Sequence, residues 1–147
     1  MDLPVNYVIY EDDQFQLDQL LRELLKESNA KTAILVDQAG FMFAQQGFSQ
    51  DIDVESLAVL AAGSFASTRE LARLVGEEEF SVLFHQGRRD NIHLSLIGED
   101  NILVVIFEST TTIGMVRLCA REAAKKMLPI IGNIKKRSMR KQPDIES

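Results

Sequence analysis

The stretch Leu57–Ala66, which reads LAVLAAGSFA, contains no charged side chain and lies within a segment that reads as one long helix. Asp53 is a suitable N-cap for that helix, and Gly76 stands where a left-handed C-terminal residue is common. A surface helix normally carries polar residues on its solvent side, so a helix that is apolar all round must be covered on more than one side. A single sheet covers one side only.

Two readings of this helix remain open. It is either a fully buried core helix of a monomer or an interface helix that a second protein surface covers. Gly63 in mid-helix costs about 1 kcal/mol relative to alanine, so it needs a packing reason, and close approach of another backbone supplies one. We favour the interface, and the predicted dimer contacts are Leu57, Ala58, Ala61 and Phe65 of this helix with Phe41 and Phe43 of a neighbouring strand.

Hydrophobic periodicity predicts the remaining elements. Leucines at spacings of three and four indicate a first helix, and short β-branched or alternating runs indicate five strands. Pro129 is expected to kink or weaken the last turn of the final helix. The predicted elements are helices 11–28, 54–75 and 114–133 and strands 31–37, 41–46, 80–85, 91–97 and 102–107.

This order, α-β-β-α-β-β-β-α, predicts an α/β fold with a five-stranded antiparallel sheet and helices on its faces. The strand 102–107 is apolar throughout, so we expect it at the centre of the sheet. With 147 residues the chain fits one domain, which we place at 1–134, followed by a flexible tail at 135–147.

The tail is basic while the rest of the chain is acidic. Five basic and two acidic residues give 135–147 a charge of +3, so a total of −6 leaves −9 elsewhere. An acidic body does not favour nucleic acid as the main partner. The tail residues Lys135, Lys136 and Arg137 can contact an acidic partner or anionic lipid, or they only keep the chain soluble.

No pattern typical of a catalytic site is present. Two histidines and one cysteine cannot supply a standard metal cluster, and no glycine-rich phosphate loop occurs. Arg88 and Arg89 fall in a turn between strands, where an exposed basic turn is favoured over an arginine finger. We expect His93 on the wet face of its strand. We therefore expect no enzyme activity, cofactor or metal, and the absence of a signal peptide predicts a cytoplasmic protein.

Several segments resemble the Roadblock/LC7 family, and the resemblance covers residues 11–133. The matching stretches are AILVDQAG at 33–40, DVESLA at 53–58 and ILVVIF at 102–107. Within the family, the chain is similar to the MglB group of bacterial gliding regulators in LARLVGEEEF at 71–80, FHQG at 84–87, LVVIFE at 103–108 and IGMVRL at 113–118.

The resemblance implies a homodimer that binds a Ras-like small GTPase of the MglA type in its GTP state. It implies activation of GTP hydrolysis, without an inserted arginine, in bacterial cell polarity and motility. The GTPase contact of that group falls on Ala62 and Ala66, and we place Arg69 and Arg73 at its rim. The alternative is a Roadblock scaffold that binds a GTPase or signalling complex without altering turnover.

Overall fold

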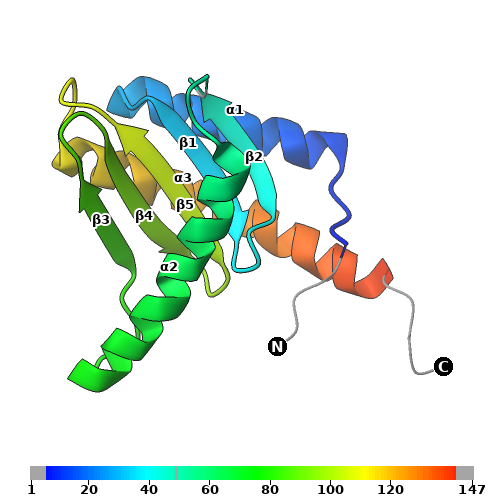
Figure 1. The fold of residues 1–147 in the computed structure, drawn as a ribbon. Coiled ribbons are helices and arrows are strands. Elements are labelled where there is room, and N and C mark those ends of the chain that lie inside the picture. Colours follow the sequence, from blue (N-terminus) through cyan, green and yellow to red (C-terminus); the bar gives the residue numbers. More distant parts are fainter. Residues whose placement is uncertain (1–5, 49, 142–147) are drawn as a thin grey trace.

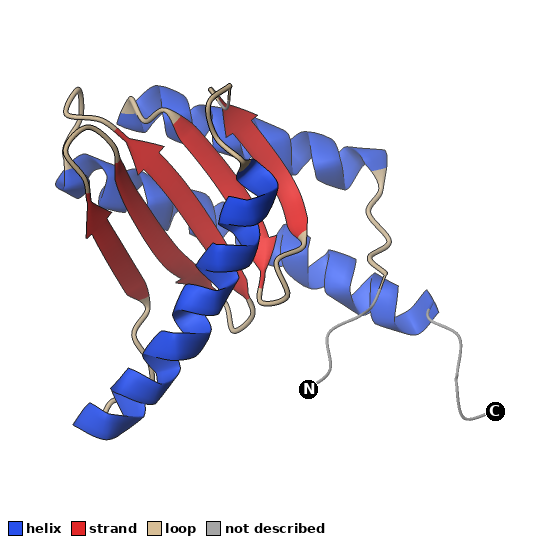
Figure 2. Cartoon of the chain, viewed as in Figure 1, coloured by secondary structure: helices blue, strands red, loops and turns tan. Residues whose placement is uncertain are grey.

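The computed structural model describes residues 6–48 and 50–141, in which five strands form one antiparallel sheet of order β2-β1-β5-β4-β3. Helices α1 and α3 cover one face of the sheet, and α2 crosses the other face alone (Figure 1, Figure 2). The predicted element order and the α/β fold class are confirmed. The elements are α1 Glu11–Ser28, β1 Thr32–Asp37, β2 Met42–Gly47, α2 Val54–Val75, β3 Val82–Gln86, β4 Asn91–Ile97, β5 Asn101–Phe107 and α3 Ile113–Lys141.

Strand β5 is the centre of the sheet, as its continuous apolar sequence predicted. It pairs with β1 on one side and β4 on the other, and all of its residues are buried. Successive side chains of a strand point to opposite faces. Leu103 and Val105 therefore contribute to the core under α1 and α3, whereas Ile102 and Val104 contribute to the core under α2.

The helix pair α1–α3 buries large side chains against its face of the sheet. Leu17, Leu21 and Leu24 follow a helical repeat on α1 and are all buried, and Met127 and Ile134 meet them from α3. Full burial of such a side chain is worth about 1.5–3 kcal/mol each. This layer is therefore the main hydrophobic core.

Helix α3 is longer than the sequence indicated, and this corrects the predicted boundary between 134 and 135. The helix continues through Pro129 to Lys141, and Pro129 itself is exposed. Downstream of the proline, Ile131, Ile134 and Ser138 are buried at helical spacing, and their packing outweighs the lost hydrogen bond. Residues 142–147 of the predicted tail lie outside the described residues.

Two of the three predicted tail residues are instead anchoring groups of α3. Lys135 Nζ lies 2.5 Å from Asn101 Oδ1, to which it donates a hydrogen bond, and 3.5 Å from Asp100 Oδ2. Arg137 donates to the Val8 carbonyl at 2.9 Å and to Asp13 Oδ2 at 2.8 Å. Both side chains are only about one-fifth exposed, so they fasten the end of α3 to its neighbours. Lys136, between them, is exposed.

Candidate protein-binding surface

Helix α2 is capped at both ends, as its sequence predicted. Asp53 accepts hydrogen bonds from the Ser56 hydroxyl at 2.7 Å and the Ser56 backbone N–H at 3.1 Å, and these bonds lower the pKa of Asp53. At the other end, Gly76 adopts φ +83°, a left-handed conformation that glycine accepts without strain, and its N–H donates to the Arg73 carbonyl at 3.3 Å. These caps fix where the helix begins and ends.

The side of α2 that faces the sheet is made mostly of alanine. Ala58, Ala61, Ala62 and Ala72 are buried, and Phe65 is the one large side chain among the buried residues of α2. Ala58, Ala61, Ala62 and Phe65 belong to one cluster with side chains of the sheet, namely Ile34, Val36, Leu94, Ile102 and Val104. Small side chains bring the helix close to the sheet but bury little apolar area of their own.

The outward side of α2 carries the large apolar residues. Leu60, Leu71 and Leu74 are 68%, 56% and 69% exposed, and Val75 is also 69% exposed. Gly63 and Ser67 lie between Leu60 and Leu71 at spacings of three and four, so these residues form one line along the helix. A Cβ added to Gly63 would meet nothing within 4 Å, so the backbone there is open to a partner. We call Leu60, Gly63, Ser67, Leu71 and Leu74 the leucine stripe.

This arrangement corrects part of the predicted dimer interface. Ala58, Ala61 and Phe65 are at most 3% exposed because they pack on the chain's own sheet, so they have almost no surface to offer a partner. Leu57 is half-buried. The reading of α2 as a fully buried core helix is also wrong, since its leucines face outward. Sequence analysis missed the leucine stripe, although its spacing of three and four was the available signal.

The predicted GTPase contacts lie on a second line of α2, between the sheet-facing side and the leucine stripe. Ala62, Ala66, Arg69 and Arg73 are separated by four, three and four residues, so they share one side of the helix. Ala62, Ala66 and Arg69 line one small hollow of about 50 Å³, together with side chains that include Gln38. Ala62 is 6% exposed and lies at its floor, whereas Ala66 is exposed.

The two arginines of this second line differ in what they contact. Arg73 pairs with Glu70 one turn before it on α2, and this pair raises the pKa of Arg73. Arg69 lines the hollow and is exposed. The structure therefore brings three of the four predicted contacts together, and it leaves Arg73 at the rim.

Strand β2 is an edge of the sheet, but its aromatic residues are not equally available. Phe43 is 2% exposed, under α1 and Tyr7, whereas Phe41 is 43% exposed. Tyr7 lies 4.9 Å from Phe41 and 4.7 Å from Phe43 between ring centroids. Burial, and then the hydrogen bond that Tyr7 donates to Asp37, raises the pKa of Tyr7. Phe43 is thus a core residue, which corrects its predicted place in the interface.

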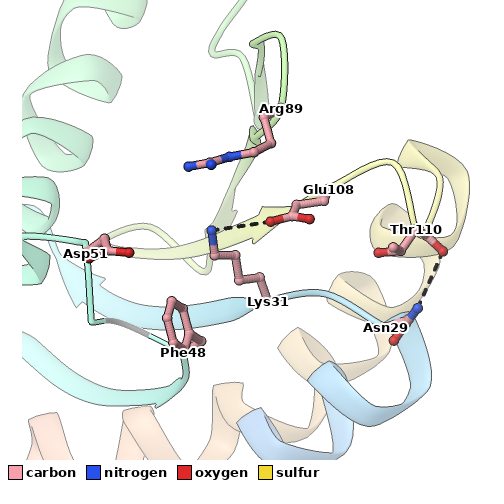
Figure 3. Close-up of a pocket in the computed structure, with 7 residues that line it drawn as sticks. All are labelled: Asn29, Lys31, Phe48, Asp51, Arg89, Glu108 and Thr110. Atoms are coloured by element: carbon pink, nitrogen blue, oxygen red, sulfur yellow. Dashed lines mark hydrogen bonds and ion pairs between the residues drawn. The ribbon is translucent and has the colours of Figure 1, made fainter.

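A polar pocket of about 420 Å³ lies at one end of the sheet, where the start of β1 and the end of β2 meet the β3–β4 turn and the end of β5 (Figure 3). Lys31 Nζ lies 3.3 Å from Asp90 Oδ1 and 3.5 Å from Glu108 Oε1, and Arg89 extends above it. Arg89 is exposed, as predicted for a basic turn, and its guanidinium lies 3.7 Å from Asp90. The charges of this pocket balance one another, so we assign Lys31 a structural role.

Within residues 6–48 and 50–141, no three His, Cys, Asp or Glu side chains gather as a metal site would require. None of the helices in that part of the chain is long and apolar enough to cross a membrane.

Comparison with known proteins gives the family. The Roadblock/LC7 domain matches residues 16–107. MglB of Myxococcus xanthus is 37% identical and superimposes with a TM-score of 0.79, covering 86% of this chain and 96% of that one. The gliding protein MglB of Thermus thermophilus is 32% identical with a TM-score of 0.80, covering 85% and 95%. An MglB described with a tetrameric arrangement is 30% identical with a TM-score of 0.82, covering 90% and 97%. The chain belongs to the Roadblock/LC7 family and, within it, to the MglB-like regulators.

Proposed function

We propose that this protein is a cytoplasmic homodimer that activates GTP hydrolysis by a Ras-like small GTPase of the MglA type, in bacterial cell polarity and motility. The observation that carries the proposal is the inverted polarity of α2, which buries alanines and exposes leucines. Large exposed apolar patches on soluble proteins mark interaction sites. The similarity to gliding proteins supports this choice of partner.

The leucine stripe supports the homodimer. A two-fold dimer buries the same surface on both copies, so one interface can cover both exposed stripes. The open backbone at Gly63 permits close approach of two α2 helices. A relative with a tetrameric arrangement supports self-association as a property of such chains.

We place the GTPase contact on the second line of α2. Ala66 and Arg69 border a small hollow, where a small side chain permits close approach and an arginine offers hydrogen bonds to carboxylate or carbonyl groups. Activation then requires only that the surface binds the hydrolysis-competent conformation of the GTPase more tightly than its other conformations. No catalytic group of this chain is needed.

Single-turnover GTP hydrolysis by the cognate GTPase, with and without this protein, tests the proposal. We expect a clear acceleration that Ala66→Arg abolishes. Arg88→Ala and Arg89→Ala serve as controls and should retain the acceleration, because neither residue lies on α2. A loss of about 10³-fold in either control would instead indicate an arginine finger. Binding without acceleration would refute activation and favour the scaffold.

A further inference from the structure

A second pocket lies under α3, on the face of the sheet opposite α2. Its volume is about 230 Å³, and its lining includes Ser81, His93, Ser95, Arg117 and Arg121. His93 and Ser95 come from β4, and the two arginines come from α3. His93 and Ser95 are two apart on one strand, so both side chains point toward α3. This pocket is separate from the surface proposed to bind the GTPase.

The histidine at this pocket lacks hydrogen-bond partners in the described part of the chain. His93 is 1% exposed, and neither Nδ1 nor Nε2 has a partner there. The Ser95 hydroxyl is also buried and has no hydrogen-bond partner there either. Buried polar atoms are nearly always hydrogen-bonded, so three such atoms at one pocket indicate a ligand or ordered water between them. The predicted wet face for His93 is therefore wrong, because α3 covers it.

Two arginines place positive charge at the pocket. Arg117 and Arg121 are four residues apart on α3, so they lie one above the other on the same side of the helix. Both are exposed, and neither forms an ion pair with any carboxylate of the described residues. Burial, and then the charge of Arg117, lowers the pKa of His93, so the imidazole at the pocket is neutral near pH 7. The net charge of the lining is positive.

We propose that this pocket binds the phosphate group of a small molecule, with Arg117 and Arg121 pairing its oxygens and with His93 and Ser95 completing the contacts from the sheet. The planar guanidinium fork matches phosphate oxygens and makes short, strong hydrogen bonds to them. Hydroxyls at Ser81 and Ser95 add neutral donors. The source of the group is either inorganic phosphate or a phosphate monoester, and both share this chemistry.

Phosphate titration of the full-length protein, followed by NMR of its two imidazoles, tests the site. Inorganic phosphate and glycerol phosphate are the probes, and chloride at the same ionic strength and pH is the control. We expect a saturating shift of the His93 resonances and no shift at His85, which is exposed on the neighbouring strand. Tighter binding of the monoester identifies an esterified ligand, and the reverse order identifies free phosphate. No saturation with either probe, or an equal response to chloride, overturns the proposal.

Charge-removing variants identify the residues responsible. Arg121→Gln should weaken phosphate binding at least 10-fold, and Arg117→Gln combined with it should abolish saturation. Because both side chains are exposed, these variants are expected to fold, and far-ultraviolet circular dichroism checks this. Arg89→Gln removes an exposed arginine on the β3–β4 turn and should leave the affinity unchanged. Equal affinity in the double variant and the unmodified protein would contradict the assignment.

Discussion

The two faces of the sheet are covered in opposite ways. On one face, α1 and α3 turn large side chains such as Leu21 and Ile134 inward, where they are fully buried. On the other face, α2 turns alanines inward and leaves Leu60 and Leu74 more than two-thirds exposed. In Figure 1, α2 also extends past the lower end of the sheet, whereas α1 and α3 lie side by side behind it.

This difference separates stability from recognition. The α1–α3 layer fills its core from within the chain, so its leucines contribute to folding. The leucine stripe of α2 is left exposed by the described residues of its own chain, so we expect a partner to bury it. Substitutions on the α1–α3 face should therefore lower the free energy of unfolding, whereas substitutions in the leucine stripe should weaken binding to a partner.

The largest expected effect is on the α1–α3 face. Leu21→Ala removes a fully buried side chain and should lower the free energy of unfolding by about 2–5 kcal/mol, measured by urea denaturation. The matched variant Leu60→Ala alters an exposed leucine. Its cost should depend on protein concentration, because the lost contact is with a second copy. Equal losses of unfolding free energy in the two variants, independent of protein concentration, would contradict the distinction between the two faces.

Next in size is the loss of GTPase binding by Ala66→Arg. The arginine places a long, charged side chain where close approach is needed, so we expect at least 100-fold weaker binding, or about 2.7 kcal/mol. Titration of the GTP-bound partner measures it, and the dimer should persist. Ala62→Arg is unsuitable because Ala62 is buried, and overpacking there would destabilise the fold. Unchanged affinity in Ala66→Arg would refute the assigned contact.

A smaller effect tests the corrected end of α3. Arg137→Ala removes an ion pair with Asp13 and the hydrogen bond to Val8, and both partners of the ion pair are at most 20% exposed. We expect a loss of about 1–3 kcal/mol in unfolding free energy. Lys136→Ala, the adjacent exposed residue, should change it by less than about 0.5 kcal/mol. Similar small losses of unfolding free energy in both variants would instead indicate that residues 135–141 are not anchored to the rest of the chain.

The smallest expected effect is the pH dependence of stability that arises from His93, on the face of β4 that α3 covers. The pKa of His93 is lowered in the folded protein from its usual value of 6.5, so the unfolded chain binds more protons between the two values. Stability contributed by the neutral imidazole is thus fully present above about pH 6.5 and declines as the pH falls toward the folded-state pKa. Imidazole titration by NMR in phosphate-free buffer checks this. A midpoint for His93 at or above 6.5 would contradict its burial.

Periodicity was sufficient to predict the elements and their order. The alternation of apolar residues predicted β4, the continuous apolar run predicted a central β5, and Asp53 and Gly76 marked the ends of α2. These patterns depend on residues close together in the sequence, so tertiary packing did not change the elements that they predicted.

The errors arose where tertiary packing decides the outcome. Pro129 suggested an early end to α3, but Ile134 and Ser138 are buried further on and extend the helix. The alternation in β4 placed His93 opposite the apolar residues, yet α3 covers that face too. The uncharged stretch Leu57–Ala66 of α2 indicated that two sides need cover, but it did not show which residues face the sheet.

Sedimentation velocity over a range of concentrations, with the unmodified protein and with Leu71→Glu, tests the central claim that the outward face of α2 is a protein interface. We expect the unmodified protein to sediment as a dimer. Leu71→Glu should sediment as a folded monomer, because Leu71 is 56% exposed in the single chain and a charge there can remain in contact with water. A monomer at all concentrations for the unmodified protein, or a dimer that Leu71→Glu leaves intact, would contradict the account.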